Sequence, residues 1–278
     1  MVAANFPWLT VLVAIPAAGA ALLGFVPPLR RAAGRLVALV IALVELCLGV
    51  YVAATAFNWS APASYQLYES RTWIPQIGVT WSVAVTSLGL VMILLALVLV
   101  PIVLVAGWNE NEDRGAQPAL VLSLQAFMVL IFAAFDLAVF YIAFEAMLVP
   151  LYLMIGRYGL GEASARHKAA MKFLLYSLFG GLVMLGGIIY IWARLAATQA
   201  DTTAFFRMDT LAGILPAQSM PAQMIIFVTF MVAFAIKAPM VPVHTWLPDA
   251  AAVARPGTSV LLVGVLDKIG TFGMITMC

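Results

Sequence analysis

The sequence predicts an all-α, polytopic membrane protein, and two observations carry that prediction. Of the 278 residues, 65% are apolar and only 9% are charged, whereas soluble domains carry about 25% charged residues. So few charges cannot cover a water-facing surface, and lipid must therefore surround most of the chain. The apolar residues also run on without the alternation of barrel strands, which indicates membrane-spanning helices.

Eight apolar runs have the length of about 20 residues that one membrane crossing needs. The seventh run contains Pro239 and Pro242, which a regular helix cannot accommodate, so we expect it to be broken within the membrane. We treat the whole chain, residues 1–278, as a single transmembrane domain. The predicted spans lie near Trp8–Val26, Leu36–Phe57, Val83–Ala106, Ala119–Phe135, Leu137–Arg157, Ala169–Arg194, Gln223–Leu247 and Thr258–Cys278.

The distribution of Lys and Arg predicts that the N-terminus faces outside. In that orientation nine basic residues fall in inner loops and three in outer loops, as the positive-inside rule requires. The inner set is Arg30, Arg31, Arg35, Arg114, Arg157, Arg166, Lys168, Lys172 and Arg255, and the outer set is Arg71, Arg194 and Arg207.

Net charge and cysteine content narrow the function classes. The formal net charge is only +2, which argues against a nucleic-acid partner. Cys47 and Cys278 lie in apolar runs away from any His cluster, so we interpret both as buried small hydrophobes and expect no metal or disulfide role.

Five ionisable residues lie inside the predicted spans: Glu45, Glu145, Lys237, Asp267 and Lys268. A charge at the bilayer centre costs about 2.5–3.5 kcal/mol on insertion scales, so each needs a reason. One alternative is a static ion pair that holds the helices together. The other is a proton or ion relay, which we favour because an acid and two lysines lie on three different helices.

Glu145, Lys237 and His244 have surroundings that suit a relay. Pro150 follows Glu145 and frees a backbone carbonyl one turn back, which can hydrate a local path. Lys237 stands just before the predicted break, where helix ends and free backbone groups flank a cavity. His244 follows about two turns later and can extend the titratable chain, although a hydrogen bond at the helix break explains it as well.

The remaining acids have simpler interpretations. Asp267 precedes Lys268, but neighbouring helix positions do not face each other, so we expect Asp267 to point toward another helix as a structural partner. Glu45 has no proline or second titratable group beside it, and we interpret it as structural. Asp136 falls at the tight turn between the fourth and fifth runs, where capping of a helix explains it.

Several strings carry a resemblance to a known family. They are Phe-Glu-Ala-Met-Leu-Val-Pro-Leu-Tyr at 144–152, Ala-Met-Lys-Phe-Leu-Leu-Tyr at 170–176, Lys-Ala-Pro-Met-Val-Pro-Val-His-Thr-Trp-Leu-Pro-Asp-Ala at 237–250 and Gly-Val-Leu-Asp-Lys-Ile-Gly-Thr at 264–271. In this order they resemble the antiporter-like M subunits of bacterial respiratory complex I, the counterparts of mitochondrial subunit 4. The His-Thr-Trp-Leu-Pro-Asp string is shared by the wider antiporter family.

The resemblance implies roles for particular residues. Glu145 and Lys237 would be the paired acid and lysine of one half-channel, and Lys268 would pass charge along the membrane mid-plane. The chain would be a proton-translocating subunit of NADH:quinone oxidoreductase in the bacterial plasma membrane, beside other membrane-arm subunits. FMN, iron–sulfur clusters and quinone would belong to those partners, and this chain would bind no redox cofactor or metal.

The sequence also departs from the family pattern. Family members contain two inverted repeats, so we expect the C-terminal half of the fold to be missing from this chain. Ala84–Ser87 lacks the acid that usually begins the third span, and Ala251–Arg255 lacks a usual His and acid. Three alternatives stay open: a subunit of a multisubunit cation/proton antiporter, a subunit of a membrane-bound hydrogenase, and a structural scaffold. The Phe-Glu-Ala-Met-Leu string favours complex I.

Overall fold

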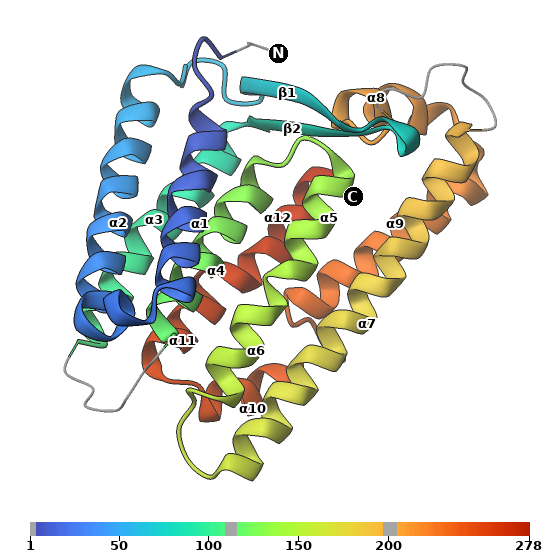
Figure 1. Cartoon of the computed structure of the whole chain (residues 1–278). Coiled ribbons are helices and arrows are strands. Elements are labelled where there is room, and N and C mark those ends of the chain that lie inside the picture. The colour runs from blue at the N-terminus through green and yellow to red at the C-terminus, as the bar shows by residue number, and fades with distance from the viewer. Residues whose placement is uncertain (1–3, 109–115, 197–204) are drawn as a thin grey trace.

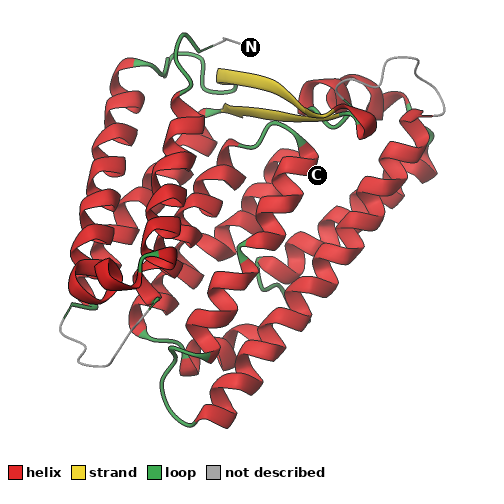
Figure 2. Cartoon of the chain, in the orientation of Figure 1, coloured by secondary structure: helices red, strands yellow, loops and turns green. Residues whose placement is uncertain are grey.

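A bundle of tilted helices is closed at one end by a two-stranded hairpin, and both chain termini lie at that end (Figure 1). The computed structural model describes residues 4–108, 116–196 and 205–278. Arg114 and the central parts of two predicted loops lie outside the described residues. The described helices and strands, drawn in Figure 2, are α1 (Trp8–Phe25), α2 (Pro27–Thr55), β1 (Gln66–Ile74), β2 (Val79–Val85), α3 (Ser87–Ala106), α4 (Gln117–Ala133), α5 (Leu137–Ala146), α6 (Leu148–Gly156), α7 (Ala163–Ala196), α8 (Met208–Ile214), α9 (Met220–Lys237), α10 (Trp246–Val253), α11 (Pro256–Leu261) and α12 (Asp267–Met277).

The mostly helical membrane fold is confirmed. Within the described residues, seven helical stretches are long and apolar enough to cross a membrane, and α4 is a shorter apolar helix of 17 residues. The predicted number of eight spans is therefore not established. The helix α2 begins at Pro27, well before the predicted Leu36. Its first part contains Arg30 and Arg31, and a kink at Ala33 separates that part from the rest of the helix.

The hairpin corrects the prediction of an all-helical chain. β1 and β2 pair antiparallel, and Gly78 provides the left-handed residue of the tight turn between them. Val83–Val85, predicted as the start of the third span, belong to β2, and α3 begins only at Ser87. Alternating β-branched and aromatic residues favour a strand here, and Thr86 then caps α3 by accepting a hydrogen bond from the Gly89 amide.

Three predicted spans are interrupted near their middle. The fifth divides at Met147 into α5 and α6, and the seventh divides between α9 and α10, which confirms the predicted break at Pro239 and Pro242. The last contains a π-helical turn, Leu262–Leu266, directly before Asp267. Such interruptions leave backbone groups without helical partners and often mark functional sites in membranes.

Cys47 and Cys278 are both exposed on this chain, so the expectation that they are buried is wrong. Both occur in apolar runs, and a membrane protein can expose such small apolar groups to lipid without cost. Many large hydrophobic side chains are exposed in the same way, among them Leu175, Phe179 and Ile189 of α7.

Candidate functional site

The C-terminal end of α9 is built as a stable helix end inside the bundle. Pro239 and Pro242 have no amide proton, so the helix cannot continue through them. Its last carbonyl groups are nevertheless bonded: Phe234 accepts from the Ala238 amide at 2.7 Å and Ala235 from the Met240 amide at 2.9 Å. The buried indole of Trp246 donates to the carbonyl of Ile236 at 2.9 Å. The end of α9 at the break is therefore held by three hydrogen bonds.

Lys237 occupies the last position of α9 and is 1% exposed. Its Nζ has no hydrogen-bond partner among the described residues. The ammonium lies 4.6 Å from the centre of the Phe144 ring, within the range of a cation–π interaction. The negative end of the α9 dipole also favours a positive charge at this position. A desolvated, unbonded lysine is held here by electrostatics and not by a fixed ion pair.

Glu145 of α5 belongs to the same charged group. Its carboxylate and the Lys237 ammonium interact electrostatically, and its Oε1 is buried without a hydrogen-bond partner among the described residues. The backbone of α7 approaches this carboxylate at Gly181, where a Cβ atom would overlap it. Gly181 therefore makes room for Glu145, a role that the sequence analysis missed.

Asp267 joins Glu145 and Lys237 from α12. Its carboxylate interacts electrostatically with Lys268 and Lys237, and its Oδ1 is buried without a hydrogen-bond partner among the described residues. The close packing of α12 against the α9 break is made at Gly270, where a Cβ would overlap Ala238 and the carbonyl of Phe234. The prediction that Asp267 points toward another helix agrees with this placement, and the helix is α9.

Lys268 lies at the edge of the group. It is exposed on this chain, and its Nζ donates to the carbonyl of Val263 in the π-helical turn at 3.3 Å. A cavity of about 470 Å³ lies between α3, the α9 break and α12. Its lining residues are Leu88, Met92, Ala238, Pro239, Val263, Asp267, Lys268, Thr271, Phe272 and Ile275. Asp267 and Lys268 are the charged residues in this lining, and most of the other lining residues are apolar.

His244 lies in the segment between α9 and α10, and its Nδ1 is buried without a hydrogen-bond partner among the described residues. That segment and the helix α10 that follows it are each joined to α7 by one contact. The Tyr176 and Thr245 hydroxyls lie 2.9 Å apart, and Lys172 forms an ion pair with Asp249 at 2.7 Å. Both contacts join the part of the chain that follows the break to α7.

The structure thus brings Glu145, Lys237 and Asp267 together from α5, α9 and α12, with Lys268 beside the adjoining cavity. Glu45 stands apart on α2, fully buried, with neither carboxylate oxygen bonded among the described residues. Three discontinuous helices around a desolvated lysine define a class of membrane protein whose spans are broken around buried charges.

The comparisons with known proteins identify the family within that class. Residues 134–278, more than half of the chain, match the family described as "NADH:quinone oxidoreductase/Mrp antiporter, TM". The chain belongs to this family. The matched region contains Glu145, Lys237, Asp267 and Lys268.

Individual relatives cover nearly the whole chain. NADH-quinone oxidoreductase subunit M of Mycobacterium tuberculosis is 39% identical over 99% of this chain and 54% of its own length. A chain 4 of the NAD(P)H-quinone oxidoreductase of Thermosynechococcus vestitus is 33% identical over 98% of this chain and 50% of its own. A chain in the structure of respiratory complex I from Thermus thermophilus with bound NADH superimposes with a TM-score of 0.81 at 28% identity, covering 97% of this chain and 52% of that one. The chain thus spans about half the length of the relatives it matches.

Proposed function

We propose that this chain is part of a proton-translocating membrane-arm subunit of an NADH:quinone oxidoreductase, and that Glu145, Lys237 and Lys268 carry the proton path. One observation carries the proposal: Lys237 is buried at a broken helix end between two carboxylates, and its ammonium is not fixed by a hydrogen bond to a described residue. A static structural pair would have short, satisfied contacts, since an unsatisfied buried charge is costly.

The proposed mechanism is electrostatic. Each opposite charge favours the charged form of its neighbour, so Lys237 near Glu145 keeps a proton on the lysine and off the acid. When the Lys237 charge moves toward Asp267 and the cavity, the Glu145 carboxylate loses that support and takes up a proton. Because the groups are coupled, they change protonation as a set and not one by one.

The cavity beside Lys268 supports the onward step. Its volume of about 470 Å³ accommodates a water chain between Asp267, Lys268 and the α9 break. His244, with its unbonded buried Nδ1, offers a second exchange group on the other side of the break.

The rest of the proposal rests on the family resemblance and, for the orientation in the membrane, on the distribution of Lys and Arg. Electron transfer from NADH to quinone, with FMN and iron–sulfur clusters, would take place on partner subunits, and this chain would contribute no redox chemistry. The partners would be other membrane-arm subunits and the lipid bilayer. The membrane would be the bacterial plasma membrane, with the N-terminus and the hairpin outside.

The test is NADH-driven acidification of inverted membrane vesicles that contain Glu145→Gln in the whole assembled complex. We expect proton uptake to collapse together with NADH oxidation. Glu162→Gln is the matched control, since Glu162 is exposed in the loop before α7, and it should leave pumping unchanged. Normal NADH-driven pumping by Glu145→Gln at equal assembly would contradict the proposal.

A further inference from the structure

Asp136, at the hairpin end of α5, is a buried acid that the proposed relay does not use. It is 0% exposed and is held on two sides by backbone contacts of its own turn. The Phe135 amide donates to the Ser82 carbonyl of β2 at 2.9 Å, and the Leu137 amide donates to the Phe206 carbonyl at 2.8 Å. The carboxylate is thus fixed between β2 and the segment that leads into α8.

The two oxygens of Asp136 have different partners. Oδ1 caps α5 by accepting from the Ala138 and Val139 amides at 2.9 and 3.4 Å, as the sequence predicts. Oδ2 faces the other way and accepts from the amide and the hydroxyl of Thr80 at 3.0 and 2.8 Å. Capping of α5 therefore explains the contacts of Oδ1 but not those of Oδ2.

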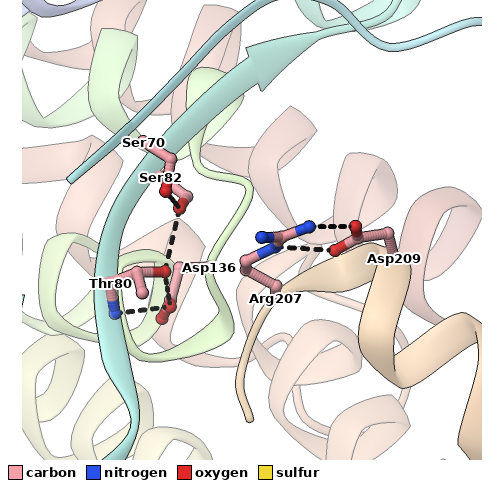
Figure 3. Close-up of polar contacts among 6 residues, drawn as sticks. All are labelled: Ser70, Thr80, Ser82, Asp136, Arg207 and Asp209. Atoms are coloured by element: carbon pink, nitrogen blue, oxygen red, sulfur yellow. Dashed lines mark hydrogen bonds and ion pairs between the residues drawn. The ribbon is translucent and has the colours of Figure 1, made fainter. Parts of the chain in front are cut away.

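From Oδ2 a continuous chain of hydroxyls leads to the surface of the hairpin (Figure 3). The Thr80 hydroxyl lies 2.8 Å from that of Ser82, which lies 2.8 Å from that of Ser70. Thr80 and Ser82 are buried, whereas Ser70 is exposed. Hydroxyls both donate and accept, so hydrogen-bonded neighbours of this kind can pass a proton in sequence.

We propose that Asp136 is a proton-exchange site that communicates with water at the hairpin end of the bundle through Thr80, Ser82 and Ser70. One proton binds the Ser70 oxygen, and the Ser70 proton passes to Ser82. The Ser82 proton passes to Thr80, and the Thr80 proton passes to Oδ2. One proton enters, one arrives, and rotation of the three hydroxyls restores the chain. This site stands independently of the proposed path through Glu145.

Burial and hydrogen bonds set when Asp136 accepts a proton. Burial raises the pKa of Asp136, and its bonds to Thr80, Ala138 and Val139 oppose that rise. The facing cation is Arg207, whose guanidinium interacts electrostatically with Asp136.

Arg207 is itself engaged elsewhere. It binds both carboxylate oxygens of Asp209, with Nε 2.9 Å from Oδ1, and lies over the Tyr68 ring at 5.6 Å. That ion pair lowers the pKa of Asp209, so Asp209 stays ionised and compensates Arg207. Tyr65, which packs against Phe135, is a further titratable group beside this turn. Within the described parts of the chain, Asp136 therefore has no ion pair of its own.

The test follows the carboxyl by infrared spectroscopy of the whole complex in membranes. The difference between wild type and Asp136→Asn during a pH titration isolates the carbonyl stretch of protonated Asp136. Transfer to deuterated water then gives the rate at which that proton exchanges. Ser82→Ala interrupts the hydroxyl chain but keeps both Thr80 bonds to Asp136, and it should slow exchange about tenfold, which corresponds to roughly 1.4 kcal/mol of activation free energy.

Two further variants keep the result interpretable. Thr72→Ala removes an exposed hydroxyl of the same hairpin outside the chain and should leave the exchange rate unchanged. Ser70→Ala, at the exposed end, should slow exchange without perturbing the buried contacts. Absence of an Asp136 carboxyl band throughout the titration, or an exchange rate equal to wild type in Ser82→Ala, would overturn the proposal.

Discussion

Glycine at two positions decides how closely the charged side chains approach one another. At Gly181 the α7 backbone lies against the Glu145 carboxylate, and at Gly270 the α12 backbone lies against the end of α9. Any side chain at these positions would separate the helices that carry the charges. Because electrostatic coupling falls with distance, two residues without side chains contribute directly to the coupling.

Gly181→Ala should therefore reduce NADH-driven proton uptake, although alanine is the better helix former by about 1 kcal/mol. The new methyl displaces Glu145 or moves α7 away from α5. Gly186→Ala provides the control on the same helix, since a Cβ there meets nothing within 4 Å. We expect Gly186→Ala to pump like wild type. Equal pumping by both variants would show that the close approach at Gly181 does not affect proton uptake.

The pH dependence of stability offers a second test at the residue scale. The pKa of Asp136 is raised above its ordinary value near 3.8, so the folded protein holds this proton more tightly than the unfolded chain does. The contribution of this group to the free energy of unfolding is then complete at pH values below its ordinary pKa, and it is lost as the pH rises through the raised pKa.

Asp136→Asn keeps an oxygen to cap α5 but cannot titrate. The loss of stability with rising pH over that window should be smaller in the variant, as measured by thermal unfolding of the detergent-solubilised complex at a series of pH values. Identical pH profiles for the variant and wild type would mean that Asp136 has its ordinary pKa in the folded protein.

At the scale of elements, the broken helix is held by a side chain that comes after the break. Trp246 opens α10, yet its indole bonds the carbonyl of Ile236, the residue before Lys237. The same tryptophan packs against Phe173 of α7 with ring centroids 5.3 Å apart. One side chain thus joins both halves of the broken span to the neighbouring helix.

Trp246→Phe should destabilise the protein by about 1–2 kcal/mol, because a buried carbonyl loses its donor while most of the packing remains. The free energy of unfolding in a mixed-micelle denaturant titration measures this loss. Trp192→Phe, an exposed position on α7, serves as the control and should have little effect. If Trp246→Phe lowers the free energy of unfolding no more than Trp192→Phe does, the indole of Trp246 does not stabilise the break.

At the scale of the whole molecule, the sequence predicts the helices and the break well because single segments carry those signals. Long apolar runs identify spans, and Pro239 with Pro242 predicts where α9 ends. The hairpin is not predicted, because Val83–Val85 continue into an apolar run. The alternation of Val79–Val85 after the turn at Pro75–Gly78 is the signal that predicts a strand here.

The site is harder to predict, because its members come from three helices whose facing sides depend on packing. The sequence alone selects Glu145 and Lys237. The parts played by Asp267 and Gly181 depend on how α12 and α7 pack against the helices that carry these two residues. The orientation of Lys268 toward the π-helical turn has no local sequence signal either. Charges inside spans are conspicuous in a sequence, whereas the residues that let them meet are not.

Whether Glu145 and Lys237 act as one unit is tested most directly by a double-mutant cycle. The rate of NADH-driven proton uptake is measured in inverted vesicles at equal assembly for Glu145→Gln, Lys237→Met and the double variant. Lys168→Met, exposed at the start of α7, is the control. We expect each single variant to lose most of its pumping, the double variant to lose no more than either, and Lys168→Met to pump normally. Normal pumping by Lys237→Met, or losses that multiply in the double variant, would contradict a shared proton path.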